Sequence, residues 1–159
     1  MRVGFGYDVH AFVPDRPLFL GGVRIPHTRG LLGHSDADVL LHAVCDALLG
    51  AAALGDIGVH FPDNDPSYKG ISSLVLLKRT VDLIGERGFR IGNIDATVVL
   101  EKPRLVSHIP EMIREISGTA GIPAGSVNVK ATTTEKLGFA GREEGIAAYA
   151  VVLLEERDH

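Results

Sequence analysis

The stretch from His34 to Gly58 constrains the fold most, because it combines a long apolar helix with polar residues that such a helix must accommodate. Its apolar residues recur at steps of three and four, namely Val39, Leu40, Ala43, Val44, Ala47 and Leu48. Ser35 and Asp36 are good N-cap residues, and Asp36 and Asp38 suit the positive end of a helix dipole. The sequence therefore predicts a buried helix that starts near Ser35 and ends near Gly50, or continues through Leu54.

Two polar residues, His42 and Asp46, lie inside this apolar helix and share one face, because they are four residues apart. The simplest interpretation is a core histidine whose ring N–H donates a hydrogen bond to the Asp46 carboxylate. The alternative interpretation, a metal ligand, depends on the N-terminal segment.

Met1–His10 alternates apolar and polar or small residues, which predicts a β-strand. The period of two puts Asp8 and His10 on one face, where Gly4 and Gly6 leave room for something bulky. An Asp-x-His pair on a strand is a compact two-ligand unit for a transition metal, although such triplets also occur by chance.

Adding His42 gives one carboxylate and two imidazoles, and catalytic zinc commonly has three protein ligands with an open fourth position. Nitrogen and oxygen ligands favour zinc over magnesium. Asp46 is then expected to accept the far N–H of a ligating histidine.

Composition limits the classes of protein that this chain can belong to. Its 159 residues suit a single domain spanning 1–159, with 155–159 expected to be a frayed tail, and 45% hydrophobic residues provide a sizeable core. The net charge is −4, and no Lys/Arg tract indicates a surface for nucleic acid or a membrane. One cysteine, no recognisable targeting segment and no long apolar span indicate a cytoplasmic protein.

The remaining elements follow from periodicity and turn signals. We expect a hairpin over Leu18–Ile25 that turns at Gly21-Gly22, a loop over Thr28–Gly33, and an amphipathic helix over Ser72–Arg87. Further expected elements are a strand over Arg90–Leu100, a helix starting at Ile109, and strands over Val127–Lys130 and Ile146–Leu154.

Two loops carry an unusual density of polar residues. Gly55–Gly70 is long for a connection without regular structure, which is typical of a functional loop, and a solvated surface loop is the alternative. The run from Ala131 to Gly145 offers three threonines to a phosphate and Glu135 to a hard cation such as Mg²⁺. It also fits a capping box, Thr132-x-x-Glu135, that opens a short helix.

Taken together, these motifs resemble those of the 2-C-methyl-D-erythritol 2,4-cyclodiphosphate synthases. The resemblance runs from residue 1 to about 154, and its most specific part is VKATTTEKLGF at 129–139. The other matching segments are Asp8-Val9-His10, Gly21–Pro26, His34-Ser35-Asp36, His42, Asp56–Gly58, Phe61–Asp63 and Gly141-Arg142-x-Glu144-Gly145.

The resemblance implies a fold, a reaction and an assembly. The fold is a single α/β domain of the α+β type, with a mixed β-sheet covered by helices on one side, and three sheets packed around a threefold axis. The reaction converts 4-diphosphocytidyl-2-C-methyl-D-erythritol 2-phosphate to the cyclic diphosphate and CMP, in the non-mevalonate route to isoprenoid precursors. The enzyme is a homotrimer with interfacial active sites and can hold an isoprenoid diphosphate in its central cavity.

The resemblance also assigns roles to residues. Asp8, His10 and His42 bind Zn²⁺, Glu135 binds Mg²⁺ or Mn²⁺ with the substrate diphosphate, and His34 and Thr133 stabilise charge in the transition state. The expected substrate-binding set is Asp8, His10, His34, Ser35, Asp56, Ile57, Gly58, Phe61, Pro62, Asp63, Asn64, Asp65, Leu100, Pro103, Arg104, Leu105, Val106, Ala131, Thr132, Thr133, Thr134, Glu135, Phe139 and Arg142.

Within that set, the residues of Leu100–Val106 and Ala131–Thr133 come from the neighbouring subunit and hold the cytidine and its phosphates. Two residues depart from the family pattern, because Arg104 replaces a usual lysine and Tyr7 a frequent phenylalanine. Arg104 keeps the charge with a different geometry, and a Tyr7 hydroxyl would make the central cavity more polar.

Two other functions stay open at this stage. A zinc hydrolase of phosphate esters would use a metal-activated water as nucleophile. An isoprenoid-diphosphate-binding trimer without catalysis would need a structural zinc site, which is normally closed by four protein ligands, whereas we count three.

Overall fold

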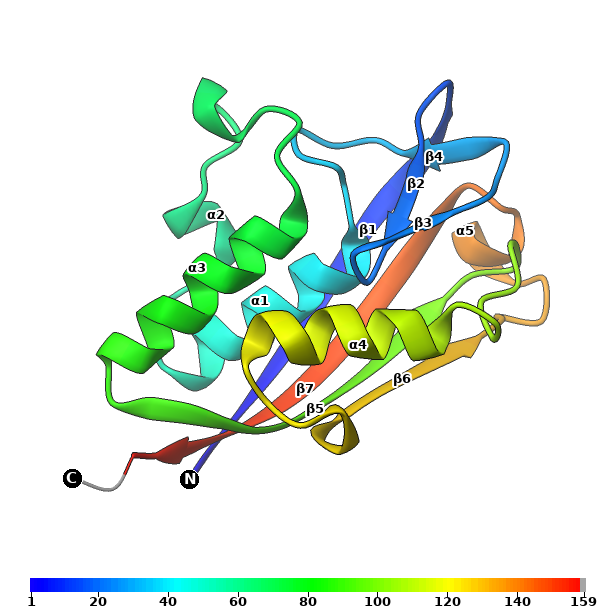
Figure 1. Ribbon diagram of the computed structural model, residues 1–159. Coiled ribbons are helices and arrows are strands. Elements are labelled where there is room, and N and C mark those ends of the chain that lie inside the picture. The colour runs from blue at the N-terminus through cyan, green and yellow to red at the C-terminus, as the bar shows by residue number, and fades with distance from the viewer. Residues whose placement is uncertain (158–159) are drawn as a thin grey trace.

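A five-stranded mixed sheet in the order β4-β1-β7-β5-β6 organises the computed structural model, which describes residues 1–157 (Figure 1). Its strands are β1 (Arg2–Pro14), β4 (Arg29–Leu31), β5 (Phe89–Val99), β6 (Val127–Thr132) and β7 (Gly145–Glu156). Among these described strands, only β5 and β6 pair in parallel, and α4 (Ile109–Ala120) connects them as a crossover. A separate hairpin, β2 (Leu18–Leu20) with β3 (Val23–Ile25), confirms the expected turn at Gly21-Gly22.

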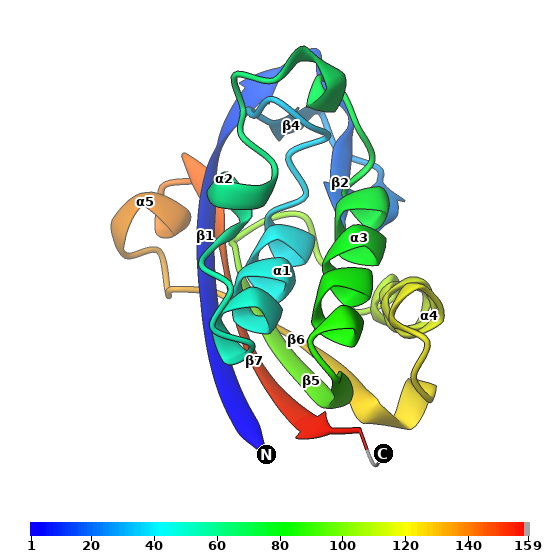
Figure 2. The same ribbon diagram turned by 90° about the vertical axis from the view of Figure 1, so that its left-hand side faces the viewer.

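Three long helices, α1 (Val39–Ala51), α3 (Ser73–Glu86) and α4, cover one face of the sheet (Figure 2). Helix α1 lies over β1 and β7, whereas α4 lies beside β6, so the helical layer spans the sheet from one edge to the other. The short helix α5 (Gly138–Gly141) lies on the opposite side. The expected mixed sheet with helices on one side is confirmed.

Two glycines of β1 set the distance between the sheet and α1. A Cβ added to Gly4 would lie 1.9 Å from the Ala47 carbonyl oxygen, and one added to Gly6 would lie 1.9 Å from that of Ala43. The space that the sequence left open on this face is therefore filled by the helix backbone. Asp8 and His10 continue the same face of β1 just beyond the glycines, close to His42 on α1.

The other face of β1 and β7 is apolar and exposed. Phe5 and Tyr7 on β1 are 61% and 45% exposed, and Tyr149 and Val151 on β7 are 38% and 45% exposed. The Tyr7 and Tyr149 rings pack against each other with 4.9 Å between centroids and a tilt of 44°. Aromatic side chains on the uncovered face of a sheet are typical of a surface that another chain covers.

The start of α1 differs from the prediction. Asp38, not Ser35 or Asp36, is the N-cap, and its fully buried carboxylate accepts hydrogen bonds from the backbone N–H groups of Leu41 (3.0 Å), Gly21 (3.0 Å) and Gly22 (2.7 Å). Burial and the neighbouring Asp36 raise the Asp38 pKa to about 6 against the effect of these donors. Asp38 therefore joins the hairpin turn to the helix, a long-range role that local sequence does not indicate.

The expected bounds of two other segments, a loop and the C-terminal tail, are wrong. The expected loop over Thr28–Gly33 contains β4, which pairs antiparallel with the end of β1. Glu155 and Glu156 belong to β7 instead of a frayed tail, because they pair with the start of β5. Arg157 is also held, because its backbone N–H donates to the Gly88 carbonyl oxygen at 2.8 Å. The last two residues of that expected tail, 158–159, lie outside the described residues.

The two polar loops also contain more local structure than expected. Gly55–Gly70 includes α2 (Ile57–His60), which Asp56 caps, and the 3₁₀ turn η1 (Pro66–Tyr68), which Asp65 caps. Outside these loops, a second 3₁₀ turn, η2 (Ala124–Ser126), precedes β6. The capping box is wrong, because Glu135 has a left-handed backbone (φ 53°) and α5 begins only at Gly138. Among residues 1–157, no helix is both long and apolar enough to cross a membrane.

Candidate metal centre and substrate pockets

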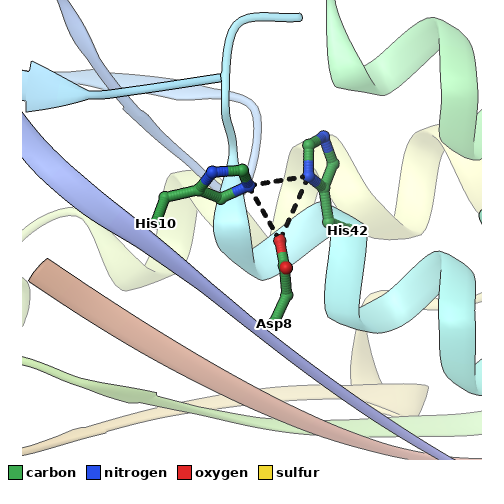
Figure 3. A group of neighbouring side chains, drawn as sticks. All are labelled: Asp8, His10 and His42. Carbon is green, nitrogen blue, oxygen red and sulfur yellow. Dashed lines mark hydrogen bonds and ion pairs between the residues drawn. The ribbon is translucent and has the colours of Figure 1, made fainter. Parts of the chain in front are cut away.

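The side chains of Asp8, His10 and His42 meet at one point between β1 and α1 (Figure 3). Asp8 Oδ2 lies 2.9 Å from His10 Nε2 and 3.2 Å from His42 Nδ1, and the two ring nitrogens are 3.1 Å apart. The donors around a tetrahedral zinc ion with bonds of about 2.0–2.1 Å are roughly 3.3 Å apart. The three observed distances therefore fit one small metal ion.

The hydrogen bond on the far side of the His10 ring supports this fit. His10 Nδ1 donates to the Leu32 carbonyl oxygen at 2.7 Å, which leaves Nε2 with a lone pair pointing toward Asp8 and His42. A ring held in this way is ready to bind a cation, since the far N–H fixes both its tautomer and its orientation.

Opposing effects control ionisation at this centre. Burial raises the pKa of Asp8, but the hydrogen bonds and charges of His10 and His42 outweigh burial and lower that pKa to about 2. Burial lowers the pKa of His10, whereas the Asp8 carboxylate, the Leu32 carbonyl and the Asp38 charge together raise it more, so the net shift is upward. The carboxylate is therefore ionised near neutral pH and stabilises positive charge beside it.

The predicted role of Asp46 is wrong. Its Oδ1 accepts a hydrogen bond from the backbone N–H of Ile57 at 2.7 Å and so anchors α2 to α1. The far nitrogen of His42, Nε2, instead lies 2.9 Å from Ser73 Oγ and 3.1 Å from Ser35 Oγ. Asp46 lies one helical turn from His42, but it stabilises the loop that forms the pocket wall.

The three donor groups open into a pocket of about 480 Å³ between β1, α1 and the loop over 55–70. Eleven of the predicted site residues line it: Asp8, His10, His34, Ser35, His42, Ile57, Gly58, Phe61, Pro62, Asp63 and Asn64. Asp56 and Asp65 do not line it, because they cap α2 and η1. The Asp65 carbonyl oxygen accepts the His34 Nε2–H at 2.9 Å and so fixes that ring.

A second pocket, of about 790 Å³, lies near the other edge of the sheet. It is formed by the loop after β5 and by the end of β6, with Leu100–Val106 and Ala131–Thr133 in its wall. The structure thus collects the predicted nucleotide-binding residues in one place, separate from the first pocket. A single chain therefore divides most of the predicted set between two pockets. The predicted substrate-binding residues that line neither pocket are Asp56, Asp65, Thr134, Glu135, Phe139 and Arg142.

The Glu101 side chain holds the threonine-rich run that lies next to this second pocket. The Glu101 Oε1 atom accepts hydrogen bonds from the backbone N–H groups of Thr134 (3.2 Å) and Lys136 (3.1 Å). The Glu135 side chain is exposed in this turn, and Phe139 lies in α5, the short helix that comes next in the chain. Arg142 is exposed and pairs with Glu144 at 3.1 Å, so its guanidinium has a carboxylate partner within the chain.

Several residues that shape the pockets were missed by sequence reasoning. His27 lines the second pocket, and Arg16 holds the loop before α1 by donating to the carbonyl oxygens of Gly33 (2.8 Å) and Ser35 (2.9 Å). Ser73 is fully buried beside His42. Of these residues, only His27 had a local sequence signal that could have indicated a pocket residue, because it directly follows Pro26, which ends the strand.

Comparison with known proteins identifies the family. The sequence profile of the YgbB family matches residues 1–155. The chain belongs to the YgbB family. The "2-C-methyl-D-erythritol 2,4-cyclodiphosphate synthase" of Syntrophobacter fumaroxidans is 74% identical to the chain over 154 residues, which are 97% of each protein.

Solved structures agree with this assignment to the YgbB family. The bifunctional IspDF from Campylobacter jejuni superposes with a TM-score of 0.95 and 48% identity, covering 99% of this chain and 42% of that one. A CDP complex of IspF from Plasmodium falciparum superposes with a TM-score of 0.87 and 34% identity, covering 99% and 97%. The likeness therefore includes a protein in a complex with a cytidine nucleotide.

Proposed function

We propose that the chain converts 4-diphosphocytidyl-2-C-methyl-D-erythritol 2-phosphate to 2-C-methyl-D-erythritol 2,4-cyclodiphosphate and CMP. The observation that carries this function is the convergence of Asp8, His10 and His42 in a pocket of a chain 74% identical to a synthase of that name. The reaction belongs to the non-mevalonate route to isoprenoid precursors. The free, buried thiol of Cys45 suits a reducing compartment, and we place the enzyme in the cytoplasm.

The metal proposed for Asp8, His10 and His42 is Zn²⁺, because the three ligands are nitrogen and oxygen atoms that leave a coordination position open. When bound there, Zn²⁺ supplies Lewis acidity and a template for a phosphoryl oxygen. Glu135, exposed on the threonine-rich turn, is proposed to hold Mg²⁺ or Mn²⁺ with the substrate diphosphate.

The chemistry is an intramolecular phosphoryl transfer. An oxygen of the 2-phosphate forms a bond to the β-phosphorus, the bond from that phosphorus to the bridging oxygen breaks, and CMP leaves with the electron pair. The nucleophile is already an anion, so the protein needs to supply orientation and charge stabilisation rather than a strong base. His34, whose ring is fixed by Asp65, and Thr133 are the residues proposed to stabilise the transferring group.

The division of the site between two pockets supports a homotrimer in which each active site lies between subunits. His34 lines the first pocket and Thr133 the second. One substrate can touch both only if the second pocket of a neighbouring chain faces the first pocket of this one. The exposed apolar face of β1 and β7 is the surface proposed to surround the threefold axis.

An isoprenoid diphosphate is a proposed ligand of the central cavity of that trimer. The apolar side chains Val3, Phe5 and Val9 would contact the hydrocarbon, whereas the Tyr7 and Tyr149 hydroxyls make the wall more polar. Arg142 would meet the diphosphate only after it exchanges its Glu144 partner for the ligand.

Turnover in ¹⁸O-labelled water tests the reaction against hydrolysis. The purified protein with the cytidylyl substrate and Mg²⁺ should release CMP and the cyclic diphosphate, both without ¹⁸O in their phosphates. A phosphate-ester hydrolase would incorporate one ¹⁸O into a product phosphate and form no ring. Labelled, open-chain product would contradict the proposal.

A further inference from the structure

The hydroxyl of Ser73 lies behind the His42 ring, on the side away from the metal-binding point. His42 Nε2 is 2.9 Å from Ser73 Oγ, and Ser73, the first residue of α3, is fully buried. Ser73 Oγ in turn donates a short hydrogen bond to Asp36 Oδ1, and the Ser73 backbone N–H donates to Asp36 Oδ2 at 2.9 Å. A continuous chain of contacts therefore runs from His42 through Ser73 to Asp36.

The directions of these hydrogen bonds fix the tautomer of His42. The carboxylate of Asp36 can only accept, so it takes the single hydroxyl proton of Ser73. Ser73 Oγ can then offer only a lone pair to His42, which requires the proton of the ring to be on Nε2. His42 Nδ1 consequently carries a lone pair, and that lone pair points toward Asp8 and His10.

The opposite tautomer would be unfavourable here. A proton on Nδ1 could donate to Asp8 Oδ2 at 3.2 Å, but Nδ1 would then offer no lone pair to a metal. The unprotonated Nε2 would also face the Ser73 lone pair at the shorter distance of 2.9 Å without a hydrogen between them. Ser35 Oγ, at 3.1 Å, could donate to Nε2 in that case, but it would not remove this repulsion. Ser35 Oγ also accepts from the Ala37 N–H at 3.2 Å and lines the pocket, where its own proton is available to a ligand.

We propose that Ser73 and Asp36 are positioning residues for the metal centre: they hold His42 in the Nε2–H tautomer and so direct Nδ1 at the metal. His10 obtains the same result from the opposite nitrogen, because its Nδ1–H donates to the Leu32 carbonyl. The two histidines therefore bind through different ring nitrogens, each fixed by a different partner. Outer partners of this kind typically change metal affinity by about 10–100-fold when removed.

The position of Ser73 explains how three parts of the fold are joined at the site. Ser73 starts α3, Asp36 lies in the segment before α1, and the Asp36 backbone N–H donates to the Ile71 carbonyl at 3.0 Å. The start of α3 is thus held against α1 at the level of His42. This proposal rests on the metal centre of the proposed function.

The decisive experiment compares Ser73→Ala with Asp46→Asn. Zn²⁺ affinity of the chelator-stripped protein is measured by competition with a chromogenic chelator. Ser73→Ala should weaken Zn²⁺ binding about 10–100-fold, and Ser73→Thr, which keeps the hydroxyl, should restore most of it. Asp46→Asn is the matched control on α1, the helix that carries His42, because Asp46 contacts Ile57 instead of His42, and its Zn²⁺ affinity should stay within about threefold of the unsubstituted value.

A spectroscopic readout separates positioning from general loss of structure. Long-range ¹H–¹⁵N spectra of the histidine-labelled, metal-free protein at pH 8.5 should show His42 protonated on Nε2 and His10 on Nδ1. Ser73→Ala should give a mixture of tautomers at His42 only. If Ser73→Ala does not fold, the unsubstituted protein still decides, since a proton on His42 Nδ1 would overturn the proposal.

The remaining outcomes also discriminate. Zn²⁺ binding by Ser73→Ala at the unsubstituted affinity, or an equal loss in Asp46→Asn, would refute the role of Ser73. If the unsubstituted protein binds no Zn²⁺, the metal assignment of the proposed function fails instead, and the tautomer spectrum still tests the hydrogen-bond chain.

Discussion

At the scale of single residues, the site depends on side chains whose partners are distant in sequence. Asp8, His10 and His42 could be chosen as ligands from the sequence because strand and helix periodicity put each on a buried face. The partners that orient these ligands could not be chosen from the sequence. Asp46 was the natural choice by helical spacing, yet Ser73, 31 residues beyond His42, occupies that place. Local spacing identifies a face, but it does not identify what packs against that face.

Asp38 provides a stability prediction at this scale. Replacing Asp38 by Ala leaves the N–H groups of Gly21, Gly22 and Leu41 without their buried acceptor. The free energy of unfolding should fall by about 2–4 kcal/mol, as measured by urea denaturation. Asp82→Ala is the control, because it breaks only the exposed ion pair with Lys78 and should cost less than about 1 kcal/mol. Equal effects of the two substitutions would argue against the capping role.

Cys45 provides a chemical prediction. Burial raises the pKa of its thiol to about 12, so at pH 8.5 the folded protein keeps the unreactive neutral thiol. An unfolded thiol has a pKa near 8.5 and is about half ionised at that pH. Ellman's reagent should therefore leave the native protein unlabelled and react fully in 6 M guanidinium chloride. Rapid labelling of the native protein would mean that α1 is not buried as described.

At the scale of elements, the close approach of β1 and α1 makes the metal centre possible. Gly4 and Gly6 were recognised in the sequence as leaving space, but the sequence did not show that a helix backbone fills it. The strands and long helices followed from periodicity. The short β4 and α2 did not, because their pairing and capping depend on contacts with β1 and Asp46.

Gly6→Ala tests this spacing. The added Cβ would overlap the Ala43 carbonyl oxygen. Helix α1 must therefore move away from β1, which increases the distance of His42 from Asp8 and His10. The unfolding free energy should drop by about 1–3 kcal/mol, and Zn²⁺ affinity should fall as well. Gly118→Ala in α4 is the control, since nothing lies near its added Cβ, and it should stabilise by about 0.5–1 kcal/mol. A neutral Gly6→Ala variant with unchanged Zn²⁺ affinity would contradict the packing argument.

At the scale of the whole molecule, one chain contains two pockets lined by predicted site residues and an exposed apolar face on β1 and β7. The resemblance predicted the sheet with helices on one side and most of the residues that line both pockets. It also implied the division between pockets, since it assigned Leu100–Val106 and Ala131–Thr133 to a neighbouring subunit, and these residues line a pocket separate from that of Asp8, His10 and His42. Periodicity and spacing alone could not give this division, because sequence order carries no information on which surfaces face each other. In the proposed homotrimer, the contact between neighbouring chains would bring the two pockets together.

Phe5→Lys tests the assembly. The unsubstituted protein should sediment as three 17.0 kDa chains, about 51 kDa in all. A lysine at the 61%-exposed Phe5 puts three buried charges around the proposed axis, so the variant should dissociate to monomers and lose turnover. Val75→Lys, on the helical side, should remain trimeric and active. A monomeric but fully active Phe5→Lys variant would refute the interfacial site.

The most direct test of the central claim is an anomalous-scattering map at the zinc absorption edge, from crystals grown with Zn²⁺. The account predicts one strong peak per chain, within about 2.0–2.1 Å of Asp8 Oδ2, His10 Nε2 and His42 Nδ1, and no peak in His42→Ala crystals. A map without density at that point, or with zinc bound only elsewhere, would contradict it.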